Sequence, residues 1–447
     1  MSELALFGGK PAVTYTGTEM FDWPIVTKED EEAVLDVLRN RKMSGTDITM
    51  EFEKQWAEWS GVKYALGTCN GTAALHAAMF GIGLGKGDEV IAPTITYWAS
   101  CLGVFSLGAT VAFADVDENM NIDPDSIEEK ITDRTKAIIV VHYLGYPADM
   151  DRIMAIAKKH NLKVIEDVSH AQGGLYKGRK VGTFGDVAAA SLMTGKSFAC
   201  GEAGMLWTDD IEIYERAVAF GSYERFGSAD DVQTESLKPF AGLPLGGYKH
   251  RMHQVSSAMG IVQLKYYDER CAEIRKALNY FGDLVEKGTD GAVWLSRVDE
   301  SEGSNMAGWY VPLMRYDSSK LEGLSLTRLC EAITAEGCWA GGGTYRPLHT
   351  HPVFFDAHIY HEDKPTRIAN SPEDIREMDK NLKNAMILNG TAFYGWWFKH
   401  FDKDILEQYA NAYIKVCKNY KELLEGDTGD KDILGGWHRF THDKKKK

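Results

Sequence analysis

The chain has 447 residues, which is enough for two or three domains of ordinary size, each with its own hydrophobic core. Apolar residues make up 44% and charged residues 26% of the sequence, so neither a disordered chain nor a bundle of membrane helices is expected. Fifty basic residues stand against 65 acidic ones, a net charge of −15, which argues against a nucleic-acid-binding protein.

The seven cysteines are scattered and never form a Cys-x-x-Cys pair. This pattern is typical of a reducing compartment and not of a disulfide framework or a zinc ribbon. The first residues lack a basic region followed by an apolar one, so we expect no signal peptide and a cytoplasmic location. We interpret the four lysines at 444–447 as a solvated tail.

Between residues 63 and 167, short apolar runs alternate with amphipathic segments. In chain order we predict a strand at 64–67, a helix at 71–81, strand 89–92, helix 97–106, strand 110–114, helix 124–130, strand 137–142, helix 150–160 and strand 163–167. The uncharged stretch 90–114 contains Pro93, Gly103 and Gly108, which favours strand–helix–strand over a membrane span. Repeated β–α units of this length predict an α/β fold with a mostly parallel sheet.

A long helical pattern at 253–277 follows, and it predicts a helix that connects two domains. From about residue 286 the composition shifts, with shorter strands such as one at 309–313 and a late helix at 404–424. We therefore predict a large domain over residues 1–277, ending in the connector helix, and a smaller α+β domain over 278–447.

Ligands of parallel sheets bind at the carboxyl ends of the strands. After the first strand, small residues lead from Thr68 to Leu75 directly into a helix start. The free backbone N–H groups and the helix dipole would suit a phosphate. A plain helix start capped by Asn70 or Thr72 explains this loop equally well.

Two further strand ends carry chemistry. Asp167 closes a buried strand, with His170 three residues on; a buried carboxylate is costly unless a cation meets it, and a protonated heterocyclic nitrogen would serve. Taken alone, Asp167 is more simply a helix cap. Lys196 stands in a run of small and apolar residues, five positions after Ser191, and a shielded amine can form a Schiff base. A lone lysine usually lies on the surface, but the three features together fit a pyridoxal phosphate (PLP) site.

Several motifs then identify a family. They are Asn70–Leu75, Gly87–Tyr97, Val141-His142, Glu166–His170, Ser191–Gly204, Gly247–Met252 and Tyr345–His349. With them, the sequence resembles the DegT/StrS family of PLP-dependent sugar and cyclitol aminotransferases over nearly its whole length. The resemblance implies the PLP-dependent transferase fold of type I, as in aspartate aminotransferase.

The resemblance also implies roles for single residues. Lys196 would hold PLP as a Schiff base and shuttle the proton, and Asp167 would keep the pyridine nitrogen protonated. The other cofactor contacts implied are Tyr97 on the ring face, His170 near the phenolic oxygen, Gly71, Thr72 and Ser191 at the phosphate, and Lys249 reaching the partner's phosphate in a homodimer with shared sites.

Substrate contacts are predicted from His142, Tyr143, His250 and His349. No metal is expected, because the histidines between 349 and 361 fit no zinc spacing. Many family members carry Asn where this chain has Lys249, and segments 358–377 and 393–400 look unlike typical members, so the acceptor pocket is expected to differ.

The implied activity moves an amino group from glutamate or glutamine to a keto-cyclitol or keto-sugar by a ping-pong mechanism. Other PLP chemistry on the same fold, such as dehydration, and a non-enzymatic PLP-binding regulator are the alternatives. Family dehydratases carry His in place of the Schiff-base lysine, so the presence of Lys196 favours the aminotransferase.

Overall fold

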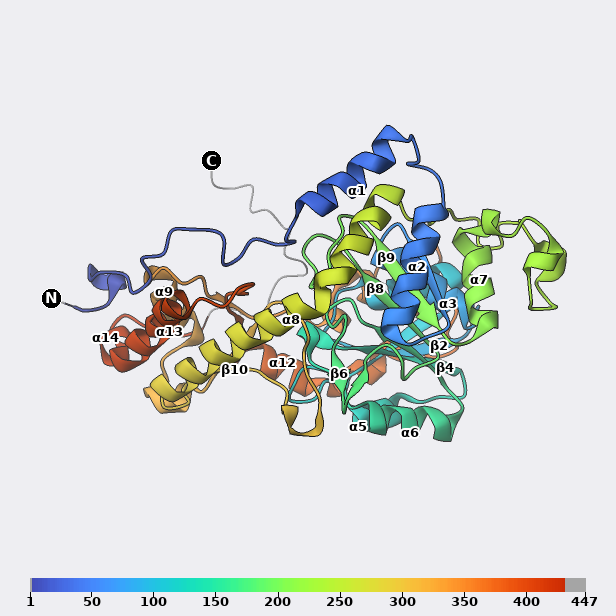
Figure 1. Ribbon diagram of the computed structural model, residues 1–447. Coiled ribbons are helices and arrows are strands. Elements are labelled where there is room, and N and C mark those ends of the chain that lie inside the picture. Colours follow the sequence, from blue (N-terminus) through green and yellow to red (C-terminus); the bar gives the residue numbers. More distant parts are fainter. Residues whose placement is uncertain (1, 431–447) are drawn as a thin grey trace.

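Seven strands form the main sheet in a computed structural model that describes residues 2–430, and this sheet lies in the larger of two lobes (Figure 1). Their order is β1-β9-β8-β5-β4-β2-β3, and every neighbouring pair is parallel except the two that involve β9. The predicted α/β fold with a mostly parallel sheet is confirmed. Within residues 2–430, no helix is both long and apolar enough to cross a membrane.

The larger lobe contains the following elements: α1 (Lys28–Arg39), α2 (Asp47–Ser60), β1 (Tyr64–Thr68), α3 (Gly71–Gly81), β2 (Glu89–Pro93), α4 (Ala99–Leu102), β3 (Thr110–Ala114), α5 (Pro124–Lys130), β4 (Thr135–Val141), α6 (Met150–His160), β5 (Lys163–Asp167), β6 (Leu175–Tyr176), β7 (Arg179–Lys180), β8 (Val187–Ser191), β9 (Gly204–Thr208) and α7 (Ile211–Gly221). The helices predicted at 71–81, 124–130 and 150–160 have these bounds in the structure. The helix predicted at 97–106 is the short α4 followed by a 3₁₀ turn.

The strands are buried on both faces, which is why they read as continuous apolar runs. Along β4, Ile138 and Val140 pack in the core formed with α5 and α6, whereas Ile139 and Val141 pack in the core formed with α3 and α7. Helices thus cover both faces of the sheet, and the loops at its carboxyl edge stay open for a ligand.

Helix α8 (Gln254–Gly288) joins the lobes and runs diagonally across Figure 1. It continues well past residue 277, where the predicted large domain ends. The smaller lobe is built on the antiparallel sheet β10-β11-β13-β12. Its elements are β10 (Val293–Leu295), β11 (Leu313–Tyr316), α9 (Leu326–Ala335), β12 (Gly341–Gly342), β13 (Ala392–Tyr394), α13 (Lys403–Lys418) and α14 (Tyr420–Leu424).

Two local predictions in this lobe differ from the structure. The strand predicted at 309–313 is wrong, because Trp309 and Val311 have φ angles of 58° and 50° and cannot continue a strand; the strand begins only at Leu313. The late helix is divided into α13 and α14 at Asn419.

Between β12 and β13, the chain leaves the small sheet and returns to the larger lobe. This segment contains α10 (Pro352–Phe355), α11 (Thr366–Ala369) and α12 (Lys383–Asn389). Buried Arg367 donates from Nε to the carbonyl oxygen of Val111 in β3 at 2.9 Å and from its terminal nitrogens to Asp379. By these contacts the segment packs against the larger lobe, and the division at residue 277 stays a prediction. The predicted lysine tail at 444–447 lies outside the described residues.

Candidate functional site

A cavity of about 600 Å³ opens at the carboxyl edge of the large sheet. Its walls come from the loops after β1, β2, β5 and β8 and from two tyrosines of the C-terminal part. The lining residues are Asn70, Gly71, Thr72, Leu75, Thr96, Tyr97, Ala99, Ser100, Asp167, Ser169, His170, Ser191, Met193, Gly195, Lys196, Glu202, Tyr310 and Tyr345. The structure therefore brings together seven residues that the sequence proposed from four separate loops: Gly71, Thr72, Tyr97, Asp167, His170, Ser191 and Lys196.

The N-terminus of α3 forms one end of the cavity. Asn70 caps the helix, since its side-chain oxygen accepts from the Ala73 N–H at 2.8 Å. Gly71 lies so close to the end of β8 that a Cβ on it would come within 2.6 Å of the Ser191 Cα. The two explanations of this loop are thus compatible: the helix is capped, and its first turn still faces the cavity beside Thr72 and Ser191 as an anion cradle.

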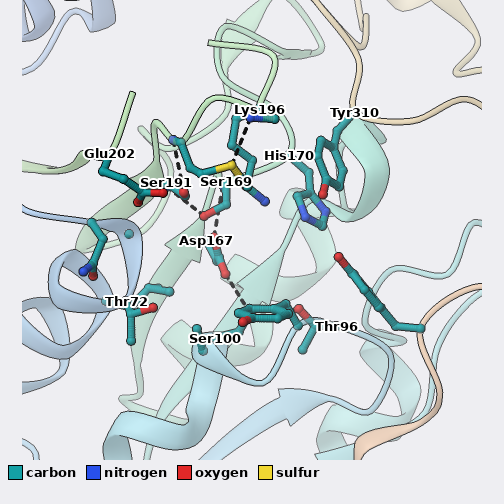
Figure 2. A pocket seen from close by; sticks show the side chains of 18 residues that line it. Thr72, Thr96, Ser100, Asp167, Ser169, His170, Ser191, Lys196, Glu202 and Tyr310 are labelled. Carbon is teal, nitrogen blue, oxygen red and sulfur yellow. Dashed lines mark hydrogen bonds between the residues drawn. The ribbon is translucent and has the colours of Figure 1, made fainter. Parts of the chain in front are cut away.

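Asp167 forms the base of the cavity and is 3% exposed. Its Oδ2 accepts from the Ser100 hydroxyl at 2.6 Å and its Oδ1 from the Ser169 N–H at 3.0 Å (Figure 2). Thr96 Oγ1 lies 2.8 Å from Ser100 Oγ and extends this network. No helix begins in the turn after β5, so Asp167 is not a helix cap. The fixed carboxylate can instead hold a cationic ring nitrogen.

Lys196 approaches from the loop after β8 and is 8% exposed. Its Nζ lies 4.3 Å from the centre of the Tyr310 ring. Tyr310 in turn stacks on His170, with ring centres 4.0 Å apart and planes inclined by 15°, and Figure 2 shows this pair beside the lysine. The lysine backbone is held too, because its carbonyl oxygen accepts from Trp23 Nε1 at 2.8 Å.

His142, predicted as a substrate contact, is not among the residues that line the cavity. The side chain is fully buried, with Nε2 3.0 Å from Glu166 Oε2. Its Nδ1 accepts from the Ala148 N–H at 3.1 Å. Glu166 also accepts three backbone N–H groups from residues 182, 184 and 185. This pair fixes the ends of β4 and β5 relative to each other.

Three other predicted substrate contacts also lie outside the cavity wall. Tyr143 is buried behind Tyr345, whose N–H it accepts at 3.3 Å. His250 stacks on Tyr248, with ring centres 5.1 Å apart, and His349 Nδ1 lies 2.7 Å from Thr94 Oγ1. Burial lowers the pKa of both histidines. Each of these side chains is engaged in packing within the chain, which is why none reaches the cavity.

Lys249 does not line its own chain's cavity. Its Nζ pairs with Glu224 Oε1 at 2.6 Å, and about half of its side chain is exposed.

Four lining residues are not predicted from the sequence: Ser100, Ser169, Glu202 and Tyr310. Ser100 lies one helical turn after Tyr97, which is a usable signal, whereas nothing local marks Tyr310.

The residues present fit PLP. Gly71 lets the N-terminus of α3 approach Ser191 closely, so that the first turn of the helix faces the cavity, and the held Asp167 carboxylate and the Lys196 side chain line the same cavity. An anion cradle, a carboxylate and a shielded amine are what the phosphate, the ring nitrogen and the aldehyde of that cofactor require.

Comparisons with known proteins agree with this arrangement. The model of the DegT/DnrJ/EryC1/StrS aminotransferase family matches residues 24–375. GDP-perosamine synthase of Escherichia coli O157:H7 is 33% identical over 354 residues, covering 78% of this chain and 91% of the synthase. A Micromonospora echinospora protein with the provisional name L-glutamine:3-amino-2,3-dideoxy-scyllo-inosose aminotransferase is 33% identical over 371 residues, covering 81% of this chain and 84% of that protein. The aminotransferase from Psychrobacter cryohalolentis superimposes with a TM-score of 0.76 at 30% identity, covering 90% of this chain and all of that one.

Proposed function

The chain belongs to the DegT/DnrJ/EryC1/StrS aminotransferase family, and from this premise we propose that it moves an amino group from glutamate or glutamine to the ketone of a keto-cyclitol or keto-sugar. It is a PLP-dependent sugar aminotransferase by its relatives. The two relatives named above support both acceptor classes, since one name contains a nucleotide-linked sugar and the other a cyclitol. The second name also contains L-glutamine as donor.

When bound, PLP supplies an electron sink that stabilises the carbanion left when an amino acid loses its α-proton. The residues of the chain bind and orient the reactants. The first turn of α3, with Thr72 and Ser191, would hold the phosphate, and Asp167 would retain the proton on the ring nitrogen. Tyr97 would cover a face of the ring, and His170 would meet the phenolic oxygen.

Lys196 has two tasks in this proposal. Its amine would hold the cofactor through the aldehyde, and as a free amine it would take the α-proton of the amino donor and later return it. The observation that carries the proposal is that Lys196, Asp167 and the α3 N-terminus share one cavity. Because the Lys196 amine can act first as a base and then as an acid, it suits a reaction that moves a proton between two nearby carbon atoms.

We further propose a homodimer in the cytoplasm. Lys249 is half exposed and does not line its own cavity, so its amine could leave Glu224 and meet the cofactor phosphate of a partner, as a point charge in place of the usual Asn. The seven cysteines are all free, which supports a reducing compartment. A Lys249→Ala protein that elutes as an active monomer would contradict the shared site.

The proposed function is tested with the purified protein and PLP. Loading should give a visible absorbance band, and L-glutamate or L-glutamine should bleach it, with L-lysine as a mismatched donor. The amino-loaded protein is then given a keto-cyclitol or a nucleotide-linked keto-sugar, and return of the band identifies the acceptor class. If no amino acid bleaches the band, the aminotransferase proposal fails.

A further inference from the structure

The side chain of Lys399 is enclosed behind the loop that carries Lys196. It is 2% exposed, and among residues 2–430 its Nζ finds no hydrogen-bond acceptor. A buried amine without an acceptor is costly, and burial holds the pKa of Lys399 well below the usual lysine value. A costly group in a packed core calls for a role beyond filling space.

Two indole rings surround this amine. The Lys399 Nζ lies 2.6 Å from the ring centre of Trp397 and 4.4 Å from that of Trp23. We name these two tryptophans the indole pair. A neutral amine, which the lowered pKa favours, can still direct its N–H groups at aromatic faces, and the enclosed Lys399 side chain fills the space between the two rings, so it helps to hold both in position.

The N–H groups of the indole pair point to the active site. Trp23 donates to the carbonyl oxygen of Lys196 at 2.8 Å. Trp397 donates to the carbonyl oxygen of Gly308 at 3.1 Å, two residues before Tyr310. Tyr310 is the ring that lies 4.3 Å from the Lys196 Nζ. The indole pair therefore holds the backbone of the reactive lysine and the loop that positions its amine.

That loop needs support from outside. Ala307, Trp309 and Val311 have φ angles of 47°, 58° and 50°, a conformation that costs free energy at each non-glycine residue and persists only where neighbours impose it. The contact from Trp397 to Gly308 lies in the middle of this strained stretch.

We propose that Lys399 is a positioning residue of the aminotransferase: by holding the indole pair, it fixes the Lys196 backbone and the Tyr310 loop in the geometry that accepts PLP. The inference rests on the proposed function in one respect, that Lys196 is the amine that takes the cofactor. Lys399 lies beyond the residues that the family model matches.

The test uses Lys399→Met, which keeps the aliphatic stem and removes the amine. PLP loading of Lys196 is measured by titrating the apo-protein, and the Tm of the apo-protein is measured in parallel. We expect the dissociation constant for PLP to rise about tenfold or more, while the Tm stays unchanged or rises because an unsatisfied amine is removed from the core. Trp23→Phe, which keeps a ring but removes the N–H, should weaken PLP loading in the same way.

Lys276→Met is the matched control, because Lys276 also lies over a ring, that of Phe401 at 4.0 Å, but is exposed. It should load PLP like the wild type. The inference is overturned if Lys399→Met binds PLP within about twofold of the wild type, or if its weaker binding comes with a lower Tm and is not reproduced by Trp23→Phe. A wild-type protein that does not load PLP on Lys196 would instead refute the proposed function itself.

Discussion

The Ser100 hydroxyl donates a hydrogen bond of 2.6 Å to Oδ2 of Asp167. Ser100 lies in α4 and Asp167 at the end of β5, so the contact ties the loop after β2 to the centre of the sheet. With Oδ1 held by the Ser169 N–H, the carboxylate cannot rotate away from the cavity. The orientation of this group determines how well a ring nitrogen stays protonated, and hence how well the cofactor accepts electrons.

Ser100→Ala should therefore slow the reaction. Loss of one hydrogen bond to a buried carboxylate corresponds to about 1.5–3 kcal/mol, so kcat for the half-reaction with the amino donor should fall by about tenfold or more. Ser100→Thr keeps the hydroxyl and should retain most of the rate. Equal kcat in wild type and Ser100→Ala, measured by single-turnover absorbance, would show that this contact does not orient Asp167.

Gly71→Ala tests the phosphate cradle. The new methyl group would meet the Ser191 backbone at 2.6 Å, so α3 must shift and the cradle must open. We expect the dissociation constant for PLP to rise by about tenfold or more, equal to about 1.4 kcal/mol or more. Gly85→Ala is the control, since its Cβ would meet only a carboxylate oxygen at 4.0 Å. Unchanged PLP affinity in Gly71→Ala would place the phosphate elsewhere.

His142→Ala separates a structural role from a substrate role. The substitution removes a donor from buried Glu166 and leaves the Ala148 N–H without its acceptor. We expect a loss of about 2–4 kcal/mol in the free energy of unfolding, with KM for the keto acceptor unchanged in the folded protein. Denaturant unfolding measures the loss of stability, and steady-state kinetics measure KM for the keto acceptor. A raised KM at unchanged stability would restore His142 as a substrate contact.

His76 should make stability depend on pH. Burial, with a smaller effect of His250, lowers the pKa of His76 from 6.5 to about 4. Above pH 6.5 both the folded and the unfolded state hold a neutral ring, so its contribution is complete. As the pH falls from 6.5 toward 4, the unfolded state takes up the proton first, and stability is lost.

From pH 7.5 to pH 5 the linkage amounts to about 2 kcal/mol. The difference in unfolding free energy between wild type and His76→Phe should change by that amount over this interval, with the wild type losing more. His358→Gln, at an exposed position, should follow the wild type. Parallel pH profiles for wild type and His76→Phe would contradict the buried neutral imidazole.

The sequence predicts the large sheet well for a physical reason. Strands such as β4 are buried on both faces and read as apolar runs, and the helices between them begin at clear caps such as Asn70 and Asp149. The prediction of a strand fails at Trp309 and Val311. Both side chains are apolar because they are buried in the core, but their backbone has the left-handed conformation. Local propensity does not report such a tertiary constraint.

The cofactor end of the site could be predicted because its residues follow strand ends, where parallel sheets bind ligands. The acceptor side could not. His142 follows a strand end too, but its ring turns into the core to meet Glu166, and nothing in the spacing distinguishes the two directions. Tyr310 reaches the cavity from the strained loop that precedes β11, more than 100 residues along the chain from Lys196. The segment at 393–400, which is expected to shape the acceptor pocket, places Lys399 in the core beside Trp397 and not in the cavity.

The most direct measurement identifies, by peptide mass spectrometry, the lysine that carries the cofactor. Protein loaded with PLP is reduced with borohydride, digested and sequenced by mass spectrometry, beside Lys196→Ala treated in the same way. The account predicts the reduced cofactor on Lys196 alone, and neither adduct nor turnover in the variant. An adduct on another lysine with full transamination, or turnover that survives in Lys196→Ala, would contradict it.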